Sequence, residues 1–356
     1  MIHCQQLSRR YGNRFAVQSV DLHVAEAELV VLVGPSGCGK STLLKMINRL
    51  IEPSSGDISV DGQKITAIAL TELRRQMGYV IQSTGLFPHW NVANNIATVP
   101  KLLGWSNEQI NRRTEELMQT LGLTPITQFK HKYPHELSGG QAQRVGVARA
   151  LAADPKVLLM DEPFAALDPI TRAALQVEVR RLQQQTQKTV IFVTHDMDEA
   201  LVMADKIAIM QNGKLIQFGK PIDLLINPVN DFVRTFIGQS DLGLKLLSQR
   251  QVAQYVHAAS ITACETRHYW QLDSQQRPQR LIGGKLDPEQ RQYVTTVNAE
   301  WLAVPTMSMK EALSRMVWYR VSVLPVVNEH GVLIGEVSLR AMMQPPAHAQ
   351  SAVGTT

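Results

Sequence analysis

The sequence predicts an α/β domain with a mainly parallel sheet, followed by a smaller α+β domain. Three short, mostly apolar runs carry this prediction, at 30–33, 157–160 and 189–193. Strands this apolar are typical of parallel sheets, because helices cover both faces of such sheets. Each run is followed by a turn and a helical pattern, which is the alternation expected of an α/β domain. The length of 356 residues is sufficient for two domains.

Composition narrows the class of protein. Apolar residues make up 44% and charged residues 19% of the chain, as in ordinary globular proteins. The net charge of +5 comes without a block of Lys and Arg, so no nucleic-acid partner is predicted. The N-terminus lacks the apolar core of a signal peptide, and no run reaches the ~18 apolar residues of a membrane span. Cys4, Cys38 and Cys264 are far apart, which favours a reducing cytoplasm over a disulfide framework or a metal site.

The first 63 residues predict short strands around turns. The strands are expected at 2–7, 16–24 and 57–60, with a tight turn at Asp61-Gly62. Tyr11 lies beside another turn, where it is either ordinary surface or a ring that stacks on adenine. The local sequence leaves both interpretations open.

The run 30–33 leads into a complete phosphate-loop pattern, G-x-x-x-x-G-K-[ST], with a helix predicted from Lys40 to Leu50. The loop consists of Gly34, Pro35, Ser36, Gly37, Cys38, Gly39, Lys40, Ser41 and Thr42. Small residues let backbone N–H groups surround an anion, and the helix N-terminus adds partial positive charge. Lys40 is expected to reach the β- and γ-phosphates, and the Ser41 hydroxyl to bind Mg²⁺. The pattern predicts a nucleoside triphosphate as the ligand.

A strand at 78–81 leads into Gln82 and an apolar loop, Leu86–Trp90. This loop is either buried or a docking surface for a partner protein. A helical insertion is predicted at about 90–153, and within it Ser106-Asn107-Glu108-Gln109 has the spacing of a capping box.

A second capping box, Ser138 with Gln141, predicts a helix that runs to Ala153. Gly139 and Gly140 lie at its start, although each glycine inside a helix costs about 1 kcal/mol relative to alanine. Close approach of a phosphate to the backbone would account for both glycines.

Polar residues follow the other two apolar runs. Asp161 and Glu162 end the second run, where a metal ligand and a base are expected at the edge of a parallel sheet. Asp168 is predicted to cap the next helix, with Pro169 at its first position. His195 follows the third run and is either structural or part of a site at the same edge.

Asp196 and Glu199 are predicted to cap the helix after His195. Strands at 206–210 and 214–218 then form a hairpin across Asn212-Gly213. The α/β domain is predicted to end near residue 238.

Together these pieces resemble the nucleotide-binding subunit of an ATP-binding-cassette (ABC) transporter. The resemblance covers residues 1–238, and its most specific motif is the five-residue signature Leu137–Gln141. It implies a P-loop ABC ATPase domain with a mainly parallel sheet, an antiparallel β subdomain and a helical subdomain. It also implies ATP and Mg²⁺ as cofactors.

The resemblance assigns roles to the matched residues. It places ATP at the phosphate loop and at the ring of Tyr11. It assigns catalysis to four side chains, Lys40, Gln82, Glu162 and His195. It assigns Mg²⁺ binding to three, Ser41, Gln82 and Asp161. The resemblance implies Glu162 as the general base and His195 as the sensor of the γ-phosphate. It implies Gln82 as the residue that couples Mg²⁺ or water at the site to the permease.

The family works as a head-to-tail pair of subunits. By resemblance, ATP held by one copy is covered in trans by Ser138, Gly139, Gly140, Gln141 and Asp168 of the other. The helix N-terminus at Ser138 then stabilises the γ-phosphate, and hydrolysis requires closure. Phe164-Ala165 departs from the family pattern, but no catalytic position is substituted, so both halves are expected to be competent.

Segments 80–90 and 161–172 most resemble importers of glycine betaine, choline and related quaternary amines. This likeness implies permease subunits in the membrane as partners, and indirectly a periplasmic or extracellular solute-binding protein. The chain is then a peripheral subunit at the cytoplasmic face of the bacterial inner membrane.

Residues 239–343 are predicted to form a regulatory domain. A helix from Met309 and a hairpin at 323–328 and 332–337, with a fainter copy at 269–284, are similar to a cystathionine-β-synthase-type (CBS) pair. Ser338–Ala341 lacks the Asp that holds a ribose in such modules. Three roles of this domain are therefore left open, namely adenosine-ligand binding, dimerisation and ionic-strength sensing. Residues 344–356 are predicted to be a disordered tail.

Other functions stay open. An importer ATPase for a different small solute fits the same motifs. A soluble ABC protein of translation or DNA repair would need two cassettes or a coiled-coil insertion, and an exporter would normally carry membrane spans. A nucleotide-binding regulator without turnover conflicts with the intact Glu162 and His195.

Overall fold

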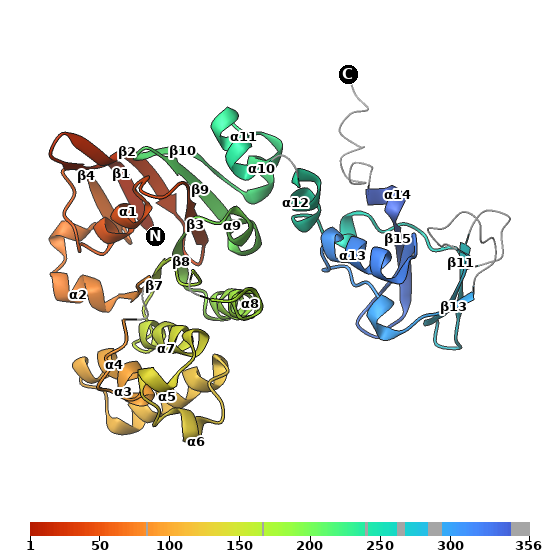
Figure 1. Ribbon diagram of the computed structural model, residues 1–356, viewed down its shortest axis with the longest axis horizontal. Helices are drawn as coiled ribbons and strands as arrows, with labels where there is room; N and C mark the ends of the chain where they lie inside the picture. Colours follow the sequence, from red (N-terminus) through yellow and green to blue (C-terminus); the bar gives the residue numbers. More distant parts are fainter. Residues whose placement is uncertain (83–84, 166, 239–240, 262–267, 284–293, 343–356) are drawn as a thin grey trace. The chain divides into compact units, whose positions relative to one another are not determined.

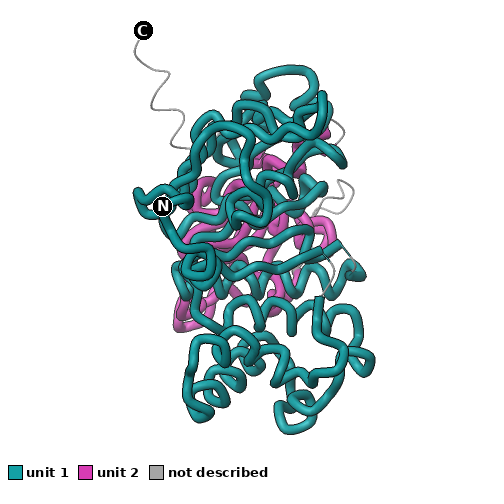
Figure 2. The backbone as a smooth tube through the Cα atoms, turned by 90° about the vertical axis from the view of Figure 1, so that its left-hand side faces the viewer, with its two compact units in different colours: residues 1–237 teal, residues 238–356 magenta. Residues whose placement is uncertain are grey.

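The chain is described from a computed structural model that covers residues 1–82, 85–165, 167–238, 241–261, 268–283 and 294–342 (Figure 1). Contacts within the chain divide it into unit 1, Met1–Ile237, and unit 2, Gly238–Thr356, which Figure 2 colours separately. The predicted tail 344–356 and Cys264 lie outside the described residues. Within the described residues, no helix is both long and apolar enough to cross a membrane.

A six-stranded sheet forms the centre of unit 1, with strand order β10-β9-β3-β8-β7-β6. Its strands are β3 (Leu29–Val33), β6 (Met77–Val80), β7 (Val157–Asp161), β8 (Thr189–Thr194), β9 (Lys206–Gln211) and β10 (Lys214–Gly219). All neighbours are parallel except β9 and β10, which form the predicted hairpin across Asn212-Gly213. Strands β3, β7 and β8 are buried along their full length, which confirms the interpretation of the three apolar runs.

A second, antiparallel sheet has the order β2-β1-β4-β5. Its strands are β1 (Ile2–Tyr11), β2 (Arg14–Val24), β4 (Ser55–Val60) and β5 (Gln63–Lys64). Side chains of both sheets and of α1 (Lys40–Ile47), such as Leu7, Leu44 and Val193, belong to one buried cluster. The phosphate loop therefore lies between two sheets that share a core. The predicted antiparallel subdomain is confirmed.

The helices of unit 1 fall into two groups, one within the helical insertion and one outside it. Those outside the insertion are α1, η1 (Ile65–Ala67), α2 (Leu70–Arg75), α8 (Pro169–Thr186), α9 (Met197–Met203), α10 (Pro221–Ile226) and α11 (Asp231–Ile237). The insertion contains α3 (Val92–Ile96), α4 (Thr98–Leu102), α5 (Asn107–Thr120), α6 (Ile126–Phe129), η2 (Pro134–Glu136) and α7 (Gly139–Leu151). These helices lie together at one end of unit 1 (Figure 1). Both predicted capping boxes, at Ser106 and Ser138, are present.

Two helix ends were predicted too late in the chain. Helix α1 ends at Ile47 rather than Leu50, because Arg49 adopts a left-handed backbone conformation with φ +47°. Helix α7 ends at Leu151 rather than Ala153, and Asp154 follows with φ +54°.

Unit 2 contains two small sheets and several short helices. The sheets are β11-β12-β13 and β14-β15, both antiparallel. The elements are α12 (Leu242–Ser248), η3 (Val252–Gln254), β11 (His268–Leu272), β12 (Pro278–Gly283), β13 (Val294–Thr296), η4 (Ala299–Trp301), α13 (Met309–Tyr319), β14 (Val323–Val327), β15 (Leu333–Ser338) and α14 (Leu339–Met342). Both predicted hairpins are present but in separate sheets. The similarity to a CBS pair stays a prediction.

Candidate functional site

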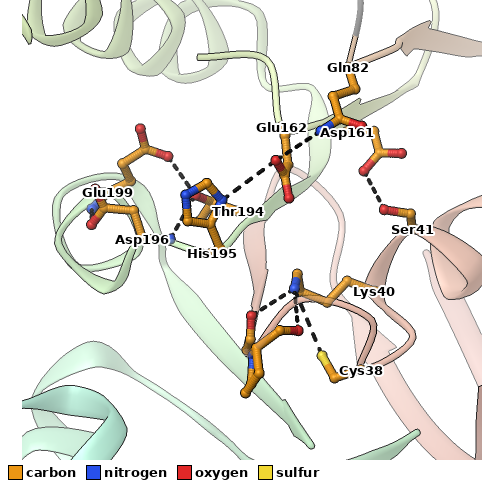
Figure 3. A network of polar contacts seen from close by, with 12 residues as sticks. Cys38, Lys40, Ser41, Gln82, Asp161, Glu162, Thr194, His195, Asp196 and Glu199 are labelled. Carbon is orange, nitrogen blue, oxygen red and sulfur yellow. Dashed lines mark hydrogen bonds and ion pairs between the residues drawn. The ribbon is translucent and has the colours of Figure 1, made fainter. Parts of the chain in front are cut away.

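The four predicted catalytic residues, Lys40, Gln82, Glu162 and His195, meet at one edge of the six-stranded sheet. Strands β3, β8, β7 and β6 are successive neighbours, and all four end at this edge. The phosphate loop follows β3, and His195 follows β8. Glu162 follows β7 and Gln82 lies just beyond β6, so the side chains converge (Figure 3). Ligands of open α/β sheets bind at the carboxyl ends of the strands.

A cavity of about 390 Å³ opens at this edge. Its lining residues are Ala16, Ser36, Gly37, Gly39, Lys40, Ser41, Thr42, Gln82, Glu162 and His195. The volume is in the range of small-molecule sites. Ala16 was missed by the sequence analysis, because it comes from the antiparallel sheet and its own residue type carries no chemistry.

Lys40 is buried within the phosphate loop, with 5% of its surface exposed. Its ammonium donates hydrogen bonds to the carbonyl oxygens of Gly34 (2.7 Å) and Pro35 (3.0 Å) (Figure 3). Gly39 precedes it with φ +110°, and a Cβ there would lie 2.2 Å from the Ala16 carbonyl oxygen. Only glycine therefore fits the last residue of the loop before the helix.

Ser41 and Asp161 place two oxygen groups side by side. The Ser41 hydroxyl donates a hydrogen bond of 2.7 Å to Asp161 Oδ1. Burial raises the pKa of Asp161, and the bond from Ser41 acts against this rise. Hydroxyl and carboxylate oxygens are the ligands that Mg²⁺ prefers, so this pair fits the predicted metal.

Glu162 connects the ends of three strands. Its Oε2 accepts a hydrogen bond from Gln82 Nε2 (3.2 Å) and lies 3.5 Å from His195 Nδ1 (Figure 3). Its backbone N–H donates to the carbonyl oxygen of Val193 at 3.0 Å. Its φ of +46° is in the left-handed region, which costs a non-glycine residue about 1–2 kcal/mol. Strain of this kind is concentrated at functional positions.

The turn that presents His195 is held by a hydrogen-bond network. Thr194 Oγ1 accepts from the Asp196 N–H (3.0 Å) and donates to Glu199 Oε2 (2.6 Å). Asp196 caps α9, as predicted. Glu199 was predicted to cap as well, and this is wrong, because its buried carboxylate instead accepts from Thr194. The sequence analysis did not single out Thr194, although a hydroxyl residue at a strand end, next to a capping turn, is a usable signal.

Several predicted site residues do not line the cavity. Gly34 and Cys38 are buried beneath the loop, and Pro35 is exposed outside the cavity. The residues expected in trans, Ser138, Gly139, Gly140, Gln141 and Asp168, lie away from the cavity at the starts of α7 and α8. Tyr11 is 48% exposed, and the guanidinium carbon of Arg9 lies 4.6 Å from its ring centre.

Gly140 also has a reason to be glycine within this chain. A Cβ there would lie 2.6 Å from Thr171 Cγ2 on α8. Packing between α7 and α8 therefore restricts this position, in addition to any approach of a phosphate.

Comparisons with known proteins agree with this architecture. A family model described as "ABC transporter" matches residues 17–165. The "Glycine betaine uptake system ATP-binding protein YehX" of Escherichia coli (strain K12) is 46% identical over 343 residues, covering 96% of this chain and 99% of that protein. The "Glycine betaine/carnitine/choline transport ATP-binding protein OpuCA" of Bacillus subtilis (strain 168) is 48% identical over 282 residues, covering 79% of this chain and 74% of that protein.

A solved structure shares the fold of unit 1. It is the dimeric, post-hydrolysis state of the ATP-binding cassette MJ0796 bound to ADP and Pi, with 32% identity and a TM-score of 0.56. The match covers 62% of this chain and 98% of that one. The fold and the phosphate-loop site thus define an ABC ATPase. More narrowly, the chain belongs to the family of ABC transporter ATP-binding proteins, and it binds nucleotide.

Proposed function

We propose that this chain hydrolyses ATP to drive uptake of glycine betaine or another quaternary amine through a partner permease. The observation that carries the hydrolysis proposal is Glu162 Oε2, which lies within reach of Gln82 and His195 beside the phosphate-loop cavity. The solute class is supported by the names of relatives that match this chain at 46–48% identity. The runner-up is an importer ATPase for a different small solute.

In this proposal, the polar side chains in and beside the cavity act on different parts of ATP. Lys40 exchanges its bonds to loop carbonyls for bonds to the β- and γ-phosphates. Ser41, Asp161 and Gln82 would hold Mg²⁺, which would neutralise charge that develops on the phosphates. Glu162 takes a proton from the attacking water, and His195 donates to the γ-phosphate.

A second copy of the chain would complete the site. At the N-terminus of α7 the N–H groups of Ser138 and Gln141 pair within the capping box, and those of Gly139 and Gly140 would point to a phosphate across the interface. Asp168 is also exposed and would contact the opposite copy. A head-to-tail homodimer satisfies both surfaces, and the similar MJ0796 cassette is dimeric in its solved structure.

The permease would dock in a groove next to the Gln82 loop. This cavity of about 370 Å³ is lined in part by Phe87, Val99 and three arginines, Arg74, Arg75 and Arg149. Phe87 is 38% exposed and packs against Trp90, with ring centres 4.7 Å apart. A lining of apolar side chains and arginines favours an amphipathic helix that carries acidic residues. Docking there would hold the chain at the cytoplasmic face of the inner membrane, with a solute-binding protein on the other side.

Unit 2 would regulate transport, because the described phosphate-loop site lies wholly in unit 1. In this proposal it biases the dimer through contacts that differ between open and closed states. Removal of residues 240–356 should change how uptake depends on salt or on a small ligand while ATPase activity is retained. Identical salt curves at equal expression would contradict regulation by ionic strength.

The proposed function is tested by ATP-driven uptake in vesicles that contain the chain with its permease and binding protein. Phe87→Asp should abolish uptake of labelled glycine betaine or choline and retain basal ATPase activity. Ile226→Asp, on the exposed side of α10, is the matched control and should transport normally. Normal uptake by Phe87→Asp would contradict the docking site, and uptake of neither solute by the wild type would favour the different-solute alternative.

A further inference from the structure

Arg172, in the first turns of α8, joins two segments of unit 1 that are distant in sequence. Its Nη2 donates a hydrogen bond of 3.0 Å to the carbonyl oxygen of Leu167, the residue before Asp168. On the other side, its Nη1 lies 3.9 Å from Asp196 Oδ2 and its Nε lies 3.7 Å from Glu199 Oε1. One guanidinium therefore contacts the segment that carries Asp168 and both acids of the turn that presents His195.

Glu199 holds the turn that presents His195 through a hydrogen bond to Thr194. It is 7% exposed and accepts the Thr194 hydroxyl proton at 2.6 Å. The same hydroxyl oxygen accepts from the Asp196 N–H, so the Thr194 side chain connects Glu199 to the backbone just after His195. A displacement of Glu199 would therefore move the backbone on both sides of His195 (Figure 3).

The contact between Arg172 and Glu199 is close but incomplete. A separation of 3.7 Å exceeds the 2.7–3.2 Å of an N–H···O hydrogen bond. Arg172 Nε is buried and finds no hydrogen-bond acceptor in the part of the chain that the structure describes. Burying an N–H without an acceptor is unfavourable, so a small movement of the two groups toward each other is favoured. Polar contacts of catalytic sites commonly tighten when the complete site assembles.

We propose that Arg172 is a positioning residue that transmits dimer closure at Leu167-Asp168 to His195. This inference rests on the proposed function for the contact of Asp168 in trans and for the role of His195. When the second copy engages Asp168, Leu167 moves with it, and Arg172 follows because it is bonded to the Leu167 carbonyl. The Arg172–Glu199 contact then closes and sets the Thr194–Asp196 turn, so that His195 meets the γ-phosphate only in the closed dimer.

The test is the ATPase activity of the full-length chain, with kcat and KM measured separately. Arg172→Ala should lower kcat by about 10- to 100-fold, the cost of misplacing a reacting group by ~1 Å. KM for ATP should stay within about two-fold, because Arg172 does not line the nucleotide cavity. Arg172→Lys should restore part of kcat, since an ammonium keeps the charge but does not reach three partners. Arg181→Ala is the control, because this arginine of α8 pairs with Glu178 instead and should leave kcat unchanged.

A double-mutant cycle separates positioning from general stability. If Arg172 acts through His195, Arg172→Ala should cause less than about a two-fold further loss in single-turnover rate when His195 is already Ala. A full additional loss in that background would overturn the proposal, as would an unchanged kcat in Arg172→Ala. If Arg172→Ala does not fold, Glu199→Gln serves in the same cycle, because it keeps an acceptor for Thr194 and removes the charge. An unchanged rate in His195→Ala alone would instead show that the proposed function of His195 is wrong, and the inference would fail with it.

Discussion

Glu336 of unit 2 is the buried charge whose removal should have the largest effect on this unit. The residue is 3% exposed. Its Oε2 accepts a hydrogen bond from Trp270 Nε1 (2.7 Å), and its Oε1 lies 3.0 Å from His268 Nε2. His257 Nδ1 is 3.7 Å away. Because Glu336 lies on β15 and both Trp270 and His268 lie on β11, these contacts connect the two sheets of unit 2.

Glu336→Ala should lower the stability of unit 2 by about 3–5 kcal/mol, the range for breaking a buried pair by removing one partner. In this variant the indole N–H of Trp270 loses its acceptor inside the core, and this loss alone costs about 1–3 kcal/mol. Glu336→Gln keeps an oxygen for Trp270 and nearly the same volume, so the expected cost is smaller, about 1–3 kcal/mol.

The contribution of Glu336 should also depend on pH. Burial opposes ionisation, but the hydrogen bonds from His268 and Trp270, with the nearby histidine charges, together lower its pKa below the usual 4.5. A carboxyl whose pKa is lowered in the folded state stabilises the fold above its unfolded pKa. This stabilisation is therefore complete above about 4.5 and lost as pH falls through the folded pKa, and Glu336→Gln should lack this dependence.

Native-state hydrogen exchange in the full chain measures this effect locally. The reporters are two backbone N–H groups. That of Trp270 donates to the Ser260 carbonyl oxygen, and that of His257 donates to the Glu336 carbonyl oxygen. A loss of about 3 kcal/mol would speed their exchange about 100-fold, provided that they exchange through opening of unit 2. Glu311→Gln, which removes the partner of Arg315 on the surface of α13, should change exchange little. Equal exchange in Glu336→Ala and Glu311→Gln would show that the contacts of Glu336 do not stabilise unit 2.

Three further outcomes are expected in unit 1. Gly39→Ala should abolish nucleotide binding in a fluorescent-ATP titration, because its Cβ would lie 2.2 Å from the Ala16 carbonyl oxygen; wild-type affinity would contradict the account of the loop. Cys4 should react with iodoacetamide at pH 8 only when the chain unfolds, since burial raises its pKa to about 12; rapid labelling of the native chain would contradict its burial. Asp168→Ala should lower the midpoint of thermal unfolding by removing the α8 cap, and Asp168→Ser should restore it; equal midpoints would contradict the cap.

Local sequence patterns were sufficient for most elements of unit 1. Apolar runs identify buried parallel strands, and the capping boxes at Ser106 and Ser138 identify helix starts, because both depend on neighbouring residues alone. Helix ends were less accurate, since Arg49 and Asp154 adopt left-handed conformations and neither is glycine, the residue that usually marks such a position.

The contacts that hold the sites together depend on tertiary structure. Nothing near Arg172 in the sequence indicates that it contacts both Leu167 and Glu199, and Ala16 reaches the cavity from another sheet. The contacts of Glu336 also depend on tertiary structure, because its partners Trp270 and His268 are more than 60 residues away in the sequence. Such pairs are brought together only by the packing of whole sheets.

In the proposed function, Glu162 is the base of an ATPase that works as a closed dimer. Glu162→Gln is the most direct test, with hydrolysis followed by phosphate release and association followed by light scattering, both with Mg²⁺ and ATP. Hydrolysis should fall by about 10²–10⁴-fold while ATP is still bound and the chain accumulates as a dimer. Lys40→Ala should neither bind ATP nor dimerise. Hydrolysis by Glu162→Gln at a rate near that of the wild type would contradict the account.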